Sequence, residues 1–330
     1  MERKEINIGA TYSTLSSAQL LENILPNYKI PAACKCDFWA RGLNDTYKVF
    51  TKNGNYSLRV YRHSWRTLSE IEFEIEALVF LNNVGAEVAY PIEKIEGGYV
   101  IPIRAPEGER YVILTKWVEG STPDYESPGN AFRYGEAVAK LHKLSSGFQS
   151  KYERYKIDLD HLLHDPIRRI KRYISHREAD VKLLENYELM LSEIVSSVSI
   201  QELDFGFCHG DIHGHNAHDA SGVITHFDFD CCGYGYRAYE LATFKWSAKL
   251  WNKELEWWPE FLNGYKSERD ISEKNLILIE PYIAIRDIWL LGLHIDNTQD
   301  ISNGWLNDKY IDKRMGLLKD VVGGITVAKS

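Results

Sequence analysis

The fold is decided by the stretch Cys208-His209-Gly210-Asp211-Ile212-His213-Gly214-His215-Asn216, which is followed by Ile224-Thr225-His226-Phe227-Asp228-Phe229-Asp230. It spaces three oxygen-bearing side chains: Asp211, Asn216 five residues later, and Asp228 twelve residues after that. Between the last two, Gly222 and the apolar pair Val223-Ile224 indicate a turn followed by a strand. The sequence therefore predicts a polar loop, a hairpin, and a carboxylate where the hairpin ends.

This spacing is typical of a site that transfers a phosphoryl group. In that chemistry one Asp orients the attacking hydroxyl and accepts its proton, while an Asn five residues on and a second Asp hold Mg²⁺ against the phosphates. Carboxylate and amide oxygens are the ligands that this hard cation prefers. We therefore predict that Asp211 is the catalytic base and that Asn216 and Asp228 bind Mg²⁺.

The same residues carry a resemblance to a known family. The stretch resembles that of aminoglycoside phosphotransferases and choline kinase-like enzymes, including type II homoserine kinases, whose His-Gly-Asp stands where protein kinases have His-Arg-Asp. The match continues through Gly233-Tyr234-Gly235 and Tyr239-Glu240-Leu241-Ala242. The family more often has Asp at the position of Glu240, so no role is transferred to this residue. The resemblance covers roughly residues 41–246 and is strongest between 209 and 242.

The resemblance implies a bilobal, protein-kinase-like α+β fold. Residues 1–115 would form a small β-rich N-terminal lobe, with a leading helix, an antiparallel sheet and one inserted helix. Residues 116–120 would be the hinge, and residues 121–330 a mainly helical lobe that holds the catalytic loop and the acceptor-binding helices.

Local patterns predict several of these elements directly. Helical spacing of apolar residues, after capping-type residues, predicts a helix over residues 14–25 and a second over residues 69–82. Residues 46–51 and 56–61 are rich in strand formers, and the turn Lys52-Asn53-Gly54-Asn55 between them predicts a hairpin. Further along, residues 111–115 are typical of a buried strand and residues 130–144 of a packed helix.

Arg59 and Glu74 are the candidate pair that positions nucleotide phosphates. Alternation along Ser57-Leu58-Arg59-Val60-Tyr61 places Arg59 on the opposite face to its apolar neighbours. Glu74 lies on the buried stripe of the helix over 69–82, where an unpaired carboxylate would be costly. By resemblance, the pair corresponds to the strand cation and helix glutamate of kinases. The alternative is a surface arginine on an edge strand.

Two further segments are assigned to the nucleotide by resemblance. Gly42 and Asn44 lie in Arg41-Gly42-Leu43-Asn44-Asp45-Thr46, where the family covers the phosphates with a glycine-poor loop. An ordinary connection between strands is the alternative, because the segment has no nucleotide-binding glycine motif. In the hinge, backbone groups around Lys116, Trp117 and Val118 would meet the adenine edge.

The acceptor is expected to be a small molecule with a hydroxyl group. Residues 241–296 interleave aromatic rings with carboxylates, a combination that suits a cationic ligand such as an amine-bearing antibiotic or amino alcohol. The alternative is an aromatic core with an acidic exterior. Arg237 borders the acceptor or braces the loop, and Asp230 touches a second ion or orients Asp228. The predicted reaction moves the γ-phosphoryl group of ATP or GTP to that hydroxyl.

Three other functions stay open at this point. A protein Ser/Thr kinase would use the same residues, and a nucleotide-binding pseudoenzyme would use only some of them. A metal-dependent hydrolase would rely on the histidine cluster of His209, His213, His215 and His218, because imidazole is a common zinc ligand. No Cys-x-x-Cys or His-Glu-x-x-His spacing accompanies that cluster.

Composition narrows the class of protein. The net charge of −8 and the pI near 5.8 argue against a nucleic-acid partner, which requires a basic face. The first residues lead into no apolar segment of signal-peptide length, and charged residues interrupt the apolar stretch 276–295, so we expect no membrane partner. Five cysteines, an odd number, indicate reduced thiols in the cytoplasm.

Overall fold

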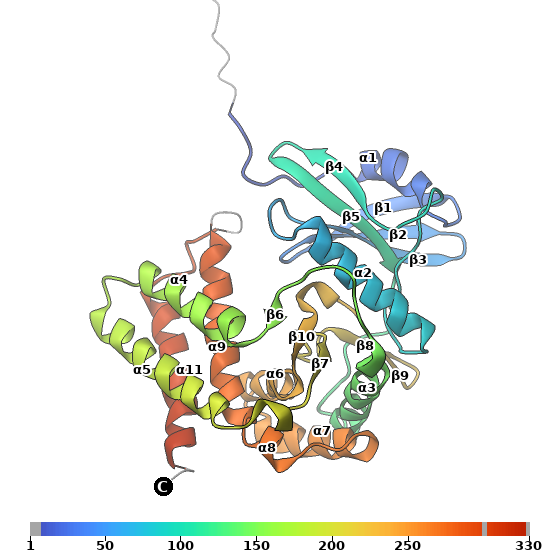
Figure 1. The fold of residues 1–330 in the computed structure, drawn as a ribbon. Helices are drawn as coiled ribbons and strands as arrows, with labels where there is room; N and C mark the ends of the chain where they lie inside the picture. Colours follow the sequence, from blue (N-terminus) through green and yellow to red (C-terminus); the bar gives the residue numbers. More distant parts are fainter. Residues whose placement is uncertain (1–7, 299–301, 328–330) are drawn as a thin grey trace, which may run out of the picture. The chain divides into compact units, whose positions relative to one another are not determined.

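The computed structural model describes residues 8–298 and 302–327, which fall into two compact units (Figure 1). The first unit holds the described residues up to 83, together with 88–119 and 150–153. The second unit holds residues 84–87, 120–149 and the described residues from 154 onward. An antiparallel sheet dominates the first unit and helices dominate the second, which confirms the predicted α+β class.

The first unit is built on a five-stranded antiparallel sheet with the order β1-β2-β3-β5-β4 (Figure 1). Its strands are β1 (Ala33–Arg41), β2 (Asp45–Thr51), β3 (Gly54–Val60), β4 (Ile101–Ala105) and β5 (Gly108–Lys116). The predicted hairpin is β2–β3, in which Thr51 pairs with Gly54 and leaves a two-residue turn. Gly54 has a φ of 118°, which a residue without a side chain adopts readily.

Helix α2 (Leu68–Asn83) covers one face of this sheet, close to the predicted bounds of 69–82. Ile71 and Ile75 of α2 pack against Tyr61 and Ile113. Apolar residues of β3, such as Leu58, belong to a separate cluster on the other face. Because side chains alternate along β3, Arg59 points to the opposite face from Leu58, toward Glu74 of α2.

The N-terminal segment covers that second face and is helical, as predicted, but over residues 17–27 instead of 14–25 and not as one regular α-helix. The chain forms α1 (Ser17–Gln19), a π-helical turn (Leu20–Ile24) and a 3₁₀ turn (Leu25–Asn27). Ser16 caps the start by accepting a hydrogen bond from the amide of Gln19. Pro26 has no N–H to continue an α-helix. Leu20 and Leu25 are nevertheless buried in the cluster, as an amphipathic segment requires.

The second unit is mainly helical. Its helices are α3 (Asn130–Leu144), α4 (Asp165–Tyr173), α5 (Glu178–Ser196), α6 (Arg237–Leu250), α7 (Glu254–Glu268), α8 (Glu273–Leu276), α9 (Ile279–Asp296) and α11 (Asp308–Val327). α3 has the predicted bounds. Two small sheets complete the unit, β6-β10-β7 and β8-β9. Their strands are β6 (Lys156–Ile157), β7 (Phe205–Cys208), β8 (Ala217–Ala220), β9 (Val223–His226) and β10 (Gly233–Tyr236).

Helices α3 and α7 approach each other closely at two glycines. A side-chain carbon added at Gly264 of α7 would collide with the carbonyl oxygen of Phe132, and one added at Gly135 of α3 with that of Phe261. The backbones of the two helices therefore meet without intervening side chains at this crossing.

The described part of the chain has neither a membrane-spanning helix nor a disulfide. No helix there is both long enough and apolar enough to cross a lipid bilayer. None of the five cysteines forms a disulfide; Cys34 on β1 is exposed, whereas Cys36, Cys208, Cys231 and Cys232 are buried.

Candidate active site

The predicted polar loop connects β7 to β8 and brings Asp211 and Asn216 together. The Nδ2 atom of Asn216 donates to the backbone carbonyl of Asp211 at 2.9 Å and to its carboxylate Oδ2 at 3.2 Å. Because the amide nitrogen faces Asp211, the amide oxygen of Asn216 lies on the other side of the group. That oxygen is placed to act as a ligand for a cation such as Mg²⁺.

The β8–β9 hairpin carries Asp228 to the same loop. The backbone N–H of Phe227, the residue before Asp228, donates to the carbonyl of Asn216 at 2.9 Å. The His209 ring accepts at Nδ1 from the amide of Asp211, at 3.3 Å, so its proton lies on Nε2 and is donated to the Phe227 carbonyl at 2.8 Å. These bonds join the loop to the end of the hairpin.

Asp228 itself has an unusual backbone conformation. Its φ is 64° and its ψ is 57°, in the left-handed region that non-glycine residues rarely adopt. Such strain is concentrated at functional sites, where the surroundings hold it in place. The side chain is exposed, so its carboxylate and the amide oxygen of Asn216 form a donor set of oxygens that fits a hard divalent cation.

Arg286 of α9 is a member of the site that the sequence interpretation missed. This buried guanidinium forms an ion pair with Oδ1 of Asp211 and donates to the Tyr239 hydroxyl at 3.0 Å. Burial alone would raise the pKa of Asp211, but Arg286, with smaller contributions from His213 and His209, holds it below its usual value. Asp211 therefore stays ionised at neutral pH, despite its burial.

Glu240 of α6, to which no role was assigned, anchors the loop. Its fully buried carboxylate accepts backbone N–H groups from His209 at 2.6 Å and Gly210 at 2.7 Å. His142 lies 3.2 Å from the same carboxylate and 2.9 Å from the Tyr265 hydroxyl, so its ring supports the loop from α3. Burial raises the pKa of Glu240, although these hydrogen bonds work in the opposite direction.

The two residues with open roles are both buried next to this loop. Arg237 donates to Asp204 at 3.0 Å and to the His142 carbonyl at 3.0 Å, which supports the bracing role. Asp230 is 3% exposed, and its backbone carbonyl accepts a hydrogen bond from Arg154.

Within the first unit, Arg59 and Glu74 form the expected ion pair. Nη1 of Arg59 lies 2.6 Å from Oε1 of Glu74, and the Tyr61 hydroxyl donates to the other carboxylate oxygen at 2.7 Å. Glu74 is 1% exposed, so the ion pair and the tyrosine compensate a carboxylate that has lost its water. Their role toward phosphates stays a prediction.

The other predicted nucleotide-binding segments make contacts of their own in this unit. Oδ1 of Asn44 accepts the backbone N–H of Arg62 at 3.1 Å, and the amide of Gly42 donates to the Asn44 carbonyl at 3.0 Å. The amide of Lys116 donates to Tyr90 at 2.9 Å and that of Trp117 to Asn55 at 3.2 Å. A purine would have to use other backbone groups of the segment 116–118.

Several of the carboxylates predicted to attract a cationic acceptor are engaged in ion pairs within the second unit. Glu254 and Glu280 both contact Lys245, and Asp287 contacts Arg314. Among the aromatic residues, Trp251 is 60% exposed, and its ring centroid lies 6.2 Å from that of His215 in the loop. An aromatic face is therefore present beside the loop.

The histidine cluster does not gather into a group of metal ligands. In the part of the chain that the structure describes, no three or more His, Cys, Asp or Glu side chains are arranged to hold a metal ion. The two ring nitrogens of His209 are hydrogen-bonded to the Phe227 carbonyl and the Asp211 amide. The His218 ring packs edge-on against Phe227, with 4.7 Å between the ring centroids.

Comparison with known proteins places this site in a family. The sequence pattern of the phosphotransferase enzyme family matches residues 38–270. An uncharacterized protein of Synechocystis sp., sll1119, is 30% identical over 94% of this chain and 87% of its own length.

Solved structures share the fold. That of amicoumacin kinase hAmiN in complex with AMP-PNP, Ca²⁺ and Ami has a TM-score of 0.75 at 19% identity, covering 92% of this chain and 93% of the other. That of a microcompartment-associated aminopropanol kinase has a TM-score of 0.75 at 22% identity, covering 93% and 98%. With the family pattern matching well over half of its length, this chain belongs to the phosphotransferase enzyme family.

Proposed function

We propose that this protein is a cytoplasmic kinase that moves the γ-phosphoryl group of ATP or GTP to a hydroxyl group of a small molecule. The observation that carries the proposal is the carboxylate of Asp211, kept ionised by Arg286 and tied to Asn216, whose amide oxygen remains for a cation. Asp211 orients the acceptor hydroxyl and takes its proton as the bond to phosphorus forms.

The remaining residues bind and align the nucleotide. Asn216 and Asp228 would hold Mg²⁺, which supplies charge neutralisation for the phosphates. Arg59 grips a phosphate with its planar fork of donors, and Glu74 fixes the direction of that fork. The loop with Gly42 and Asn44 and the backbone of Lys116, Trp117 and Val118 contribute the rest of the nucleotide site. Rate enhancement comes from alignment and electrostatic stabilisation.

We further propose that the acceptor is a cationic alcohol, such as an amino alcohol or an amine-bearing antibiotic. Two structural relatives are an amicoumacin kinase and an aminopropanol kinase, and aminopropanol is an amino alcohol. The exposed ring of Trp251 beside the loop offers a face that attracts an ammonium group. This support comes from the aromatic ring alone, because the carboxylates of Glu254 and Glu280 already form ion pairs with Lys245.

The test is a panel of hydroxylated amines and antibiotics, assayed for an ATP-dependent gain of one phosphate in mass. With an acceptor found, Asp211→Asn should reduce kcat by about 10³-fold or more, because it removes the proton acceptor while leaving the nucleotide contacts. The Kd for AMP-PNP, measured by calorimetry, should stay within a few-fold of wild type. Equal turnover by wild type and the variant would remove Asp211 from this role.

A further inference from the structure

The connection between β1 and β2, residues 42–44, is the loop proposed to cover the nucleotide phosphates. Arg41 and Asp45, the residues at its two ends, pair in register. Gly42 is exposed, and its amide donates to the Asn44 carbonyl at 3.0 Å, which closes the loop on itself. The direction of an exposed loop depends on what holds its ends.

The N-terminal segment contacts both ends of this loop. The Tyr12 hydroxyl donates to Oδ1 of Asp45 at 2.7 Å. The guanidinium carbon of Arg41 lies 4.2 Å from the centroid of the Tyr12 ring, close enough for a cation-π contact. Arg41 also donates to the Thr14 hydroxyl and, at 3.1 Å, to the same oxygen of Asp45. Residues 12–14 therefore form a strap across the base of the loop.

A fully buried arginine of β5 joins the strap to the sheet. Arg110 forms an ion pair with Oδ2 of Asp45 at 2.9 Å, and its Nη1 atom donates to the Ser13 carbonyl at 2.9 Å. Its Nε atom donates at 2.7 Å to the carbonyl of Tyr61, two residues after Arg59. Buried charges keep such a geometry, because the loss of one partner would leave the other charge without compensation. One side chain thus holds the strap, the loop and the end of the strand that carries Arg59.

We propose that residues 12–14 are positioning residues, which hold the loop 42–44 in the conformation that binds the nucleotide. This inference rests on the proposed function. Tyr12 acts through Asp45, with no contact to the nucleotide of its own. A loop that is already held in its bound conformation loses less conformational freedom on binding, so release of the strap weakens nucleotide affinity. Proton transfer at Asp211 does not depend on the strap.

Tyr12→Phe is the test, because it removes the hydroxyl that bonds Asp45 and keeps the ring over Arg41. Hydrogen–deuterium exchange of the full chain should become faster at the amides of residues 42–45. The Kd for AMP-PNP with Mg²⁺, measured by calorimetry, should rise about threefold to tenfold, the cost of ordering one side chain. With an acceptor found, KM for ATP should rise by the same factor, and kcat should stay within about twofold.

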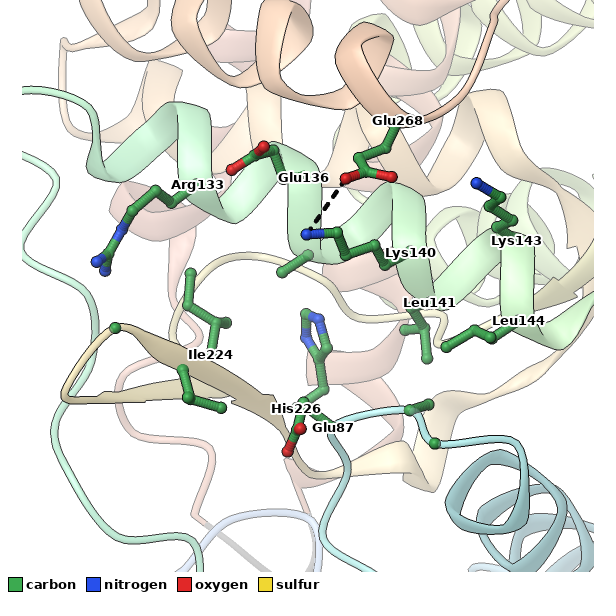
Figure 2. A pocket seen from close by; sticks show the side chains of 15 residues that line it. Glu87, Arg133, Glu136, Lys140, Leu141, Lys143, Leu144, Ile224, His226 and Glu268 are labelled. Atoms are coloured by element: carbon green, nitrogen blue, oxygen red, sulfur yellow. Dashed lines mark ion pairs between the residues drawn. The ribbon is translucent and has the colours of Figure 1, made fainter.

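Two control variants lose a comparable contact elsewhere. Tyr28→Phe removes a buried hydroxyl that lies 3.1 Å from backbone carbonyls of the first unit. Lys140→Met removes the ion pair with Glu268, at 3.3 Å, beside a cavity of about 460 Å³ in the second unit (Figure 2). Both variants should keep the wild-type exchange of residues 42–45 and the wild-type Kd for AMP-PNP.

The possible failures can be told apart. If wild type binds AMP-PNP and Tyr12→Phe binds it equally well, or if exchange in the loop is unchanged, this inference alone is overturned. An equal rise in Kd for Tyr28→Phe also overturns it, because lost stability would then explain the effect. Wild type that does not bind AMP-PNP overturns the proposed function and this inference together. If Tyr12→Phe does not fold, as judged by circular dichroism, Thr14→Val takes its place, because it removes the hydroxyl that accepts from Arg41.

Discussion

At the scale of single residues, the buried ion pair between Arg286 and Asp211 is the feature with the clearest chemical consequence. The cation lowers the pKa of Asp211 even though burial raises it. Asp211, the proposed base, is therefore ionised down to a pH below the usual range for a carboxyl group. Removal of the cation leaves burial opposed mainly by the smaller contributions of His213 and His209, so the pKa of Asp211 should rise.

We predict that Arg286→Met moves the acidic limb of the pH profile of kcat/KM upward by about 1–2 pH units, the effect of losing one close opposite charge. The measurement is initial rate against pH at low acceptor concentration. Arg286→Lys retains the positive charge and should keep the limb near its wild-type position. A limb that coincides in wild type and Arg286→Met would show that Arg286 does not act through the charge of Asp211.

The site residues differ in how far sequence alone could reveal them. Asp211, Asn216 and Asp228 are close in sequence and carry a motif, and Arg59 and Glu74 lie 15 residues apart on adjacent elements, so local patterns suffice. Arg286 lies 75 residues from Asp211, and no local pattern joins them. The available signal was a charged side chain within an apolar helix, since such a group needs a buried partner.

At the scale of secondary-structure elements, the close crossing of α3 and α7 depends on Gly264, which has no side chain. A carbon at Gly264 would collide with the Phe132 carbonyl, which belongs to rigid helix backbone. The helices would have to separate, and close-packed interiors transmit such shifts to their neighbours.

We predict that Gly264→Ala lowers the free energy of unfolding by about 2 kcal/mol or more, in the range of overpacked cores. The measurement is urea unfolding followed by circular dichroism. Gly316→Ala in α11 is the matched control, because an added carbon there meets no atom within 4 Å and the residue has no positive φ. It should raise stability by about 0.5–1 kcal/mol through helix propensity. Equal effects of the two substitutions would contradict the close approach of α3 and α7.

Elements with a strong period or a strong turn signal could be predicted from sequence. The bounds of α3 agree with the prediction, and those of α2 differ by one residue at each end. The β2–β3 hairpin turns within the predicted segment Lys52-Asn53-Gly54-Asn55. The N-terminal segment could not be predicted in the same way. Its apolar residues have the correct spacing for burial, but α-, π- and 3₁₀-helical turns all satisfy that spacing over so short a length.

At the scale of the whole molecule, ligand binding should increase the stability of the folded chain. A nucleotide and a divalent cation that bind only the folded chain shift unfolding by mass action. In the second unit the expected cation ligands lie at the joined ends of the loop and hairpin, where opening of the backbone would lose both together.

We predict that AMP-PNP with Mg²⁺, at about 100 times its Kd, adds about 2.7 kcal/mol to the stability of the chain. Thermal unfolding should show a higher midpoint with both present, and EDTA should abolish most of the gain. Asp228→Asn, which weakens the oxygen donor set, should show a smaller increase than wild type. No difference between Mg²⁺ and EDTA would contradict the assignment of Asn216 and Asp228 as metal ligands.

The placement of the thiols offers a practical route to studying the first unit. Four of the five sulfur atoms are buried, and burial raises the pKa of Cys36 to about 11, so that it is protonated in neutral solution. Cys34, on β1, is exposed. A maleimide dye should therefore attach at one known position in native protein, giving a fluorescent reporter strand without engineered cysteines.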